Sequence, residues 1–273
     1  MNVQAPRVTA ATPVLLRADD GPIATLTFNH PETRNVLSEA VLSALSENLT
    51  AIAGDPRVRV VVLAAEGPVF SAGHDLKQMT EHRADSDGGR RYFKQLMNTC
   101  SAMMQQVVNL PKPVIAAVEG TATAAGCQLV ATCDLAIASS TAKFGTSGIN
   151  VGLFCSTPMV AVSRKVARKH ALELLLTGDL VSAEEAYRMG LINRVVEPGR
   201  ALAEAAELAR KIATKSPAAI RLGKQAFYRQ AEMGLAEAYR LTSDVLVENM
   251  MEDDAEEGIS AFIAKRPPKR EDR

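Results

Sequence analysis

Two short segments carry the residue types best suited to chemistry, Phe70–Leu76 and Gly120–Leu129. In each segment, an apolar run typical of a strand gives way to small residues, and a run typical of a helix follows. A helix that begins directly after such a turn leaves backbone N–H groups without intrahelical partners, and these groups can bind negative charge. If the two turns face each other, their N–H groups would form an oxyanion hole that stabilises the negative oxygen of a reacting carbonyl compound.

The elements around these turns alternate between strand and helix. Val58–Ala65 and Val114–Val118 are almost entirely apolar, which is typical of strands buried on both faces of a sheet. Ser38 is the expected N-cap of a helix, because apolar residues follow it at helical spacing. The alternation indicates an α/β core with a largely parallel sheet, which we expect over residues 1–197, followed by a helical region over residues 198–273.

The composition argues against several classes of function. The 31 Lys and Arg residues balance the 31 Asp and Glu residues, so the chain lacks the positive charge with which proteins bind nucleic acids or anionic membranes. The four cysteines show no CxxC spacing and the four histidines do not cluster, so we expect no metal site. Scattered cysteines suit a reducing compartment, and no apolar run is long enough to span a membrane.

The sequences FSAGHDL (residues 70–76) and GTATAAGCQL (residues 120–129) resemble the two signature turns of the enoyl-CoA hydratase/isomerase superfamily, the crotonases. The resemblance extends over most of the chain. It implies the crotonase fold, in which repeated ββα units form a spiral sheet and a C-terminal helical region mediates trimerisation. Further similarity, at residues 124–129, 152–158 and 258–262, is to one subgroup of this family that occurs in animals.

The resemblance also implies a ligand and an assembly. Crotonases act on acyl-CoA thioesters in fatty acid metabolism, many of them as lyases, with coenzyme A as part of the substrate and no separate cofactor. By resemblance, the oxyanion hole consists of the backbone N–H groups of His74 and Ala125. We expect a homotrimer or hexamer located in the cytoplasm, or in the mitochondrial matrix if the source is eukaryotic.

Eight residues match positions that contact coenzyme A in the family. Six belong to two segments, Arg34-Asn35-Val36 and Ala72-Gly73-His74, with the adenine expected near the second. The other two, Lys224 and Phe227, match a C-terminal helix that closes the nucleotide pocket of a neighbouring subunit. A cation and an aromatic ring three residues apart lie on one helix face. A position in the core is an equal alternative for Phe227.

Two positions depart from the family pattern. Where hydratases carry two catalytic glutamates, this sequence aligns Gln128 and Gly148. An amide does not exchange protons near pH 7 and glycine has no side chain, and the loss of one acid–base group typically costs about 10² to 10⁴ in rate. We therefore expect weak hydration, and we expect the paired substitutions Gln128→Glu and Gly148→Glu to raise it.

These residues are compatible with several activities. An oxyanion hole without glutamates suits decarboxylation of a malonyl-type CoA ester, or thioester hydrolysis by a water held on Gln128. A pseudoenzyme that only binds acyl-CoA, and a hydratase with its carboxylate elsewhere, are the alternatives. The side chain of His74 is expected to pack, with acid–base chemistry as the alternative. Cys155 is expected to be a buried thiol rather than a nucleophile.

Overall fold

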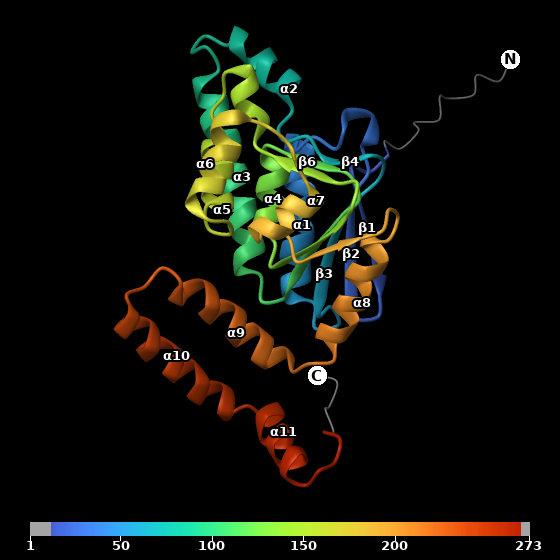
Figure 1. Ribbon diagram of the computed structural model, residues 1–273, viewed down its shortest axis with the longest axis vertical. Helices are drawn as coiled ribbons and strands as arrows, with labels where there is room; N and C mark the ends of the chain where they lie inside the picture. The colour runs from blue at the N-terminus through green and yellow to red at the C-terminus, as the bar shows by residue number, and fades with distance from the viewer. Residues whose placement is uncertain (1–11, 269–273) are drawn as a thin grey trace, which may run out of the picture.

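Two hydrogen-bonded sheets form the centre of the computed structural model, which describes residues 12–268 (Figure 1). One sheet has the strand order β1-β2-β3-β5-β7-β10, with strands Leu15–Asp20, Ile23–Phe28, Val60–Ala65, Val114–Val118, Leu135–Ser139 and Arg194–Val196. The other has the order β4-β6-β8-β9, with strands Val69–Ser71, Thr121–Thr123, Lys143–Gly145 and Val181–Ser182.

Successive repeats place one strand in each sheet, namely β3 then β4, β5 then β6, and β7 then β8. In the part of the chain that the structure describes, every strand pair is parallel except the hairpin β1–β2 and the pair β8–β9. The expected α/β fold of repeated ββα units is therefore confirmed.

The helices lie between and around these strands. They are α1 (Glu39–Gly54), α2 (Leu76–Glu81), α3 (Arg90–Asn109), α4 (Ala125–Thr132), α5 (Ser156–Val162), α6 (Arg168–Thr177), α7 (Ala183–Met189), α8 (Ala201–Ala213), α9 (Pro217–Gln230), α10 (Leu235–Met250) and α11 (Asp253–Ile263). The described residues also form the short 3₁₀ turns η1 (Pro31–Thr33), η2 (His82–Ala84) and η3 (Ser147–Val151). Within residues 12–268, no helix has the length and apolar character needed to cross a membrane.

The larger sheet is buried on both faces. Val61 and Leu63 of β3 belong to the cluster that contains the buried residues of α1, α3 and α4, whereas Val60 and Val62 pack with α8 on the opposite face. Helix α8 presents alanines at four-residue spacing, which lets it approach the sheet closely. Because α8 forms part of the core, the separate helical region begins at α9 rather than at residue 198. The extreme ends of the two expected ranges lie outside the described residues.

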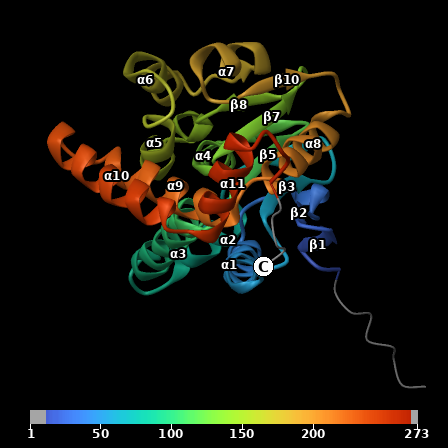
Figure 2. The ribbon, with the colours of Figure 1, turned by 90° about the horizontal axis from the view of Figure 1, so that it is seen from below.

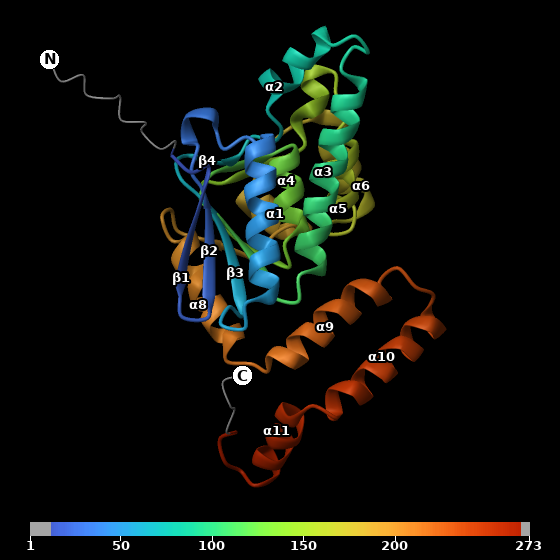
Figure 3. The ribbon, with the colours of Figure 1, turned by 180° about the vertical axis from the view of Figure 1, so that it is seen from behind.

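Helices α9, α10 and α11 form an arm that extends away from the sheets (Figures 1 and 3). The view from below shows α10 reaching out beyond the core, with α9 between α10 and the sheet layers (Figure 2). No residue of α10 is buried. Large apolar side chains of the arm are strongly exposed, among them Leu235 at 77%, Met251 at 80% and Phe262 at 84%. Such a surface is typical of an interface with another chain.

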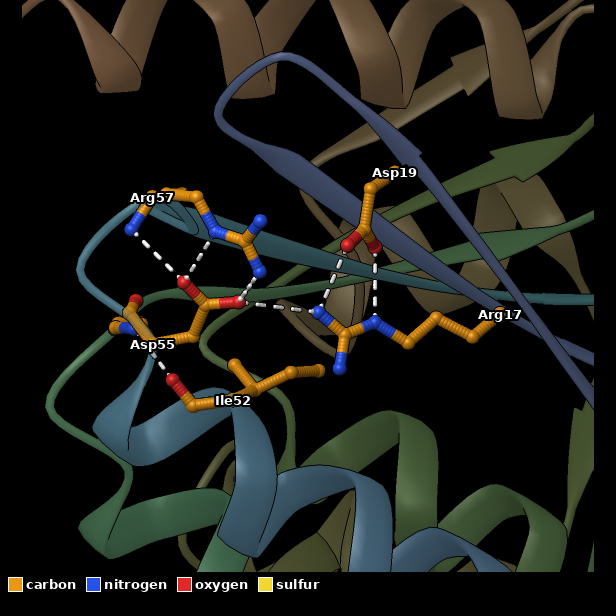
Figure 4. Close-up of polar contacts among 6 residues, drawn as sticks. Arg17, Asp19, Ile52, Asp55 and Arg57 are labelled. Atoms are coloured by element: carbon orange, nitrogen blue, oxygen red, sulfur yellow. Dashed lines mark hydrogen bonds and ion pairs between the residues drawn. The ribbon is translucent and has the colours of Figure 1, made fainter.

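A network of charged side chains ties β1 to the end of α1 (Figure 4). Arg17 donates two hydrogen bonds to Asp19, at 2.9 and 2.8 Å, and Arg57 pairs with Asp55 in the same way at 3.0 and 2.9 Å. An ion pair of 3.6 Å between Arg17 and Asp55 joins the two pairs. The arginine hydrogen bonds hold the pKa of both carboxyls below its usual range. Helix α1 is about 24 Å long, so this network lies well away from the turns at the other end of the helix.

Candidate functional site

The two signature turns touch each other. Gly73 has a φ of +91°, a conformation that favours glycine, and a Cβ built there would lie 2.9 Å from the Cβ of Ala124 and 3.1 Å from the backbone nitrogen of Ala125. The fold therefore brings together two segments that are about fifty residues apart in the sequence. This is the arrangement that an oxyanion hole requires.

Hydrogen bonds on both sides fix the first turn. The N–H of Leu37 donates to the carbonyl of Gly73 at 2.7 Å, and the N–H of Gly73 donates to Ser71 Oγ at 3.2 Å. Asp75 is the N-cap of α2 and accepts hydrogen bonds from the backbone N–H groups of Lys77 and Gln78. Within the described chain, the N–H of His74 takes part in none of these bonds, so it remains available to a ligand.

The second turn is held tightly against the first. Ala124 adopts a φ of 50° and a ψ of −122°, which is strained for alanine, while its N–H donates to Gly145 at 3.0 Å. Helix α4 begins at Ala125, so the N–H of Ala125 is one of the unpaired donors at a helix N-terminus. Gly126 allows this close packing, because a Cβ there would lie only 2.3 Å from the carbonyl oxygen of Ser71.

Gln128 lies one turn into α4 and is 4% exposed. Within the described residues its Oε1 atom is buried without a hydrogen-bond partner. Gly148 lies in η3, which a 2.8 Å hydrogen bond between Ser147 Oγ and Thr123 Oγ1 ties to the end of β6. The amide oxygen of Gln128 is therefore available to accept a hydrogen bond from a ligand or a water.

A side chain at position 148 has no room in this structure. A Cβ on Gly148 would lie 2.5 Å from the carbonyl oxygen of Leu153 and 2.8 Å from the Sγ of Cys155. A glutamate there requires the segment 153–155 to move. The gain in hydration expected from Gln128→Glu and Gly148→Glu together therefore depends on a rearrangement of this segment.

The substitution Gly148→Ala tests this crowding. Because added methyl groups in well-packed regions typically cost about 1–3 kcal/mol, we expect a loss near the lower end of that range, since the contacting atoms lie in a loop that can shift. Urea unfolding of the two proteins measures it. No loss of stability would mean that the 148–155 segment adapts freely and that a glutamate could be accommodated.

The structure brings together the first six residues predicted to contact coenzyme A. The N–H of Ala72 donates to the carbonyl of Arg34 at 3.0 Å, so the segment 34–37 runs alongside the first turn. Arg34 and Asn35 both adopt left-handed backbone conformations, with φ of 60° and 50°. Arg34 is exposed, whereas Val36 is partly buried.

Asn35 has a structural role instead of a ligand-facing one. Its side chain is 1% exposed, accepts from the N–H of His30 and donates to the carbonyls of Glu66 and Val69 at 2.9 and 2.7 Å. These bonds use the hydrogen-bonding capacity of the amide within the protein. Asn35 therefore positions the segment that carries Arg34.

Lys224 and Phe227 lie elsewhere. The ammonium group of Lys224 donates to the carbonyls of Val107 and Lys112, both at 3.0 Å, and to Asp134 at 2.7 Å. These acceptors use all three of its N–H donors. The geometry therefore opposes the assignment of Lys224 to coenzyme A and gives it a role in attaching the arm. Phe227 is 60% exposed and packs edge to face with Tyr228, so it does not belong to the core of the subunit.

Two further observations bear on the chemistry of the site. Burial raises the pKa of Cys155, which keeps the thiol protonated and argues against a nucleophilic role.

Sequence reasoning overlooked Tyr92 of α3, whose hydroxyl is buried without a hydrogen-bond partner in the described part of the chain. No local signal in the sequence distinguished Tyr92 from the other residues of the expected helix. No cluster of three or more potential metal ligands occurs in residues 12–268.

Comparisons with known proteins agree with this geometry. A model of the family described as enoyl-CoA hydratase/isomerase matches residues 19–273. The human enoyl-CoA hydratase domain-containing protein 3, mitochondrial, is 47% identical over 256 residues, which cover 94% of this chain and 82% of the human protein. This is the animal subgroup whose similarity the sequence indicated.

Solved structures of similar proteins share the fold of this chain. The crystal structure of an enoyl-CoA hydratase from Mycobacterium smegmatis matches with a TM-score of 0.90 and 50% identity, over 94% of this chain and 99% of the other. The structure of human enoyl-CoA hydratase domain-containing protein 3 matches with a TM-score of 0.89 and 45% identity, over 94% and 100%. The chain belongs to the enoyl-CoA hydratase/isomerase family, the crotonase superfamily.

Proposed function

We propose that the protein binds acyl-CoA thioesters and stabilises the thioester enolate in an oxyanion hole formed by the N–H groups of His74 and Ala125. The observation that carries the proposal is the contact between the turns, in which Gly73 lies against Ala124 and Ala125. Each N–H is free of protein partners within the described residues, and Ala125 adds the positive end of the α4 dipole. The exposed Arg34 beside this turn suits the phosphates of coenzyme A.

Ordinary hydration is expected to be weak. Gln128 can hold water or substrate but does not transfer a proton, and position 148 offers neither a carboxylate nor space for one. Reactions that need enolate stabilisation alone, such as decarboxylation of a malonyl-type CoA ester, suit the site better. Binding without turnover is the second candidate, and it is favoured by the same absence of carboxylates at positions 128 and 148.

The test is mass spectrometry of an acyl-CoA panel incubated with concentrated protein. The panel contains enoyl, malonyl-type and saturated thioesters. We expect the thioesters to bind, and the mass change of any product identifies the reaction as gain of water, loss of carbon dioxide or release of the acyl group. Ligands retained without conversion would favour the binding protein, and failure to retain any thioester would contradict the proposal. Free coenzyme A as competitor shows whether retention is specific.

We further propose that the arm of α9–α11 assembles the chain into a homotrimer or a pair of trimers. The support is the exposed apolar surface of α10 and α11. Light scattering after gel filtration distinguishes monomer, trimer and hexamer.

For the cellular location, we propose a reducing compartment, either the cytoplasm or, in a eukaryotic cell, the mitochondrial matrix. The animal relatives are named mitochondrial.

A further inference from the structure

Four buried side-chain atoms among residues 12–268 have no hydrogen-bond partner. They are both ring nitrogens of His74, the hydroxyl of Tyr92 and Oε1 of Gln128. Leaving a buried polar group unpaired is costly, and the great majority of such groups in native proteins are paired. Unpaired groups concentrated in one place therefore indicate a site that a ligand completes.

Two of these residues, His74 and Gln128, flank the contact between the two turns. His74 follows Gly73, which lies against Ala124 and Ala125, and Gln128 is one helical turn beyond Ala125. Tyr92 lies in α3, where burial raises the pKa of its phenol and the charges of Glu39, Asp75 and Glu81 raise it further.

Of these groups, only His74 can take up a proton near neutral pH. The phenol of Tyr92 stays protonated because its pKa is raised, and an amide such as Gln128 is not basic. Burial lowers the pKa of His74, and the backbone of Leu37, which forms no regular hydrogen bond with the ring, opposes this shift in part. The ring is therefore neutral at pH 7 and has one nitrogen lone pair available. The carboxylate of Asp75 is engaged in capping α2.

We propose that the His74 imidazole is the acid–base group of this site, in place of the two glutamates of the hydratases. It takes a proton from the α-carbon of a bound acyl-CoA thioester and returns it. The inference rests on the proposed function, because it needs the thioester in the oxyanion hole.

The step is balanced without a further reactant. The Cα–H bond breaks and its proton moves to a ring nitrogen of His74. The electron pair of that bond forms the enolate double bond, while the carbonyl π pair moves onto the thioester oxygen, between the N–H groups of His74 and Ala125. The reverse step restores the thioester. Tyr92 and Gln128 hold the acyl group or a water by hydrogen bonds.

Exchange of the α-protons of butyryl-CoA in D₂O, followed by mass spectrometry, tests the proposal. We expect the wild-type protein to incorporate deuterium and His74→Gln to do so about 10²- to 10⁴-fold more slowly, as for loss of an acid–base group. The substitution keeps the backbone N–H, so the Kd for butyryl-CoA should change less than about threefold. Because the ring makes no hydrogen bond to the described residues, the variant breaks none and should fold.

Two variants sharpen the test. His170→Gln removes a partly exposed histidine of α6 and should leave exchange unchanged. His74→Asn is a second variant that removes the imidazole. Exchange is compared in whichever of the two His74 variants has the Tm of the wild-type protein.

The outcomes separate the two proposals. If the wild-type protein binds butyryl-CoA but His74→Gln exchanges as fast, or if the wild-type protein shows no exchange above a protein-free blank, the role of His74 is overturned and the proposed function stands. If the wild-type protein binds no thioester, the proposed function itself fails. One result supports the inference: the His74 variant exchanges α-protons slowly but binds butyryl-CoA as tightly as the wild-type protein.

Discussion

Replacing Lys224 by methionine is expected to lower the free energy of unfolding by about 3–5 kcal/mol, the typical cost of removing one partner of a buried ion pair. The Lys224 side chain is 6% exposed and pairs with Asp134 at 2.7 Å. Asp134 also accepts from the hydroxyl of Tyr228 at 2.9 Å and from the N–H of Val114 at 2.7 Å. Without Lys224 the Asp134 carboxylate, which is only 16% exposed, loses its ion-pair partner, and two backbone carbonyls lose their donor. Urea unfolding at one fixed protein concentration measures the loss.

An exposed ion pair between the same two parts of the molecule provides the control. Arg164 and Glu232 pair at 2.9 Å with both side chains more than half exposed, so Arg164→Met should cost less than about 1 kcal/mol. The double variant Lys224→Met, Asp134→Asn should recover part of the loss, because it removes the unpaired charge. A loss below 1 kcal/mol for Lys224→Met would contradict the buried ion pair and reopen a role for Lys224 in ligand binding.

Gly126→Ala is expected to have the second largest effect, a loss of about 3 kcal/mol together with loss of thioester binding. The added methyl group would lie 2.3 Å from the backbone oxygen of Ser71 and 2.8 Å from its Cβ. Overpacking typically costs about 1–3 kcal/mol, and the upper end applies because both segments are buried and neither is free to shift. The two turns must move apart to remove this overlap. The N–H of Ala125 would then be misplaced relative to the N–H of His74.

Gly223→Ala is the matched control. Gly223 lies within α9, and a Cβ there meets nothing within 4 Å. The change should stabilise the protein by about 0.5–1 kcal/mol, since alanine favours the helix over glycine. Binding of butyryl-CoA by isothermal titration is compared at a temperature where both variants are folded. Gly126→Ala with wild-type affinity would show that the contact between the turns is not needed for the ligand.

Local signals predicted the elements well. The hairpin β1–β2 follows from the sequence Asp19–Pro22 between two β-prone runs. Ser38 accepts a hydrogen bond from the backbone N–H group three residues on, as expected of an N-cap. Each of these features depends on residues close together in the sequence, where side-chain type and spacing determine the structure.

The sequence by itself determined the family, the α/β fold and the two turns, because glycines, small residues and apolar periodicity act over a few residues. Tertiary structure alone decided the rest. Only the folded chain places Gly73 against Ala125, fills the space at Gly148 with Leu153 and Cys155, and occupies Lys224 with Asp134. It also leaves the ring of His74 buried and unpaired. Packing between distant segments decides whether a side chain has room, a partner or access to a ligand, and no short-range pattern encodes it.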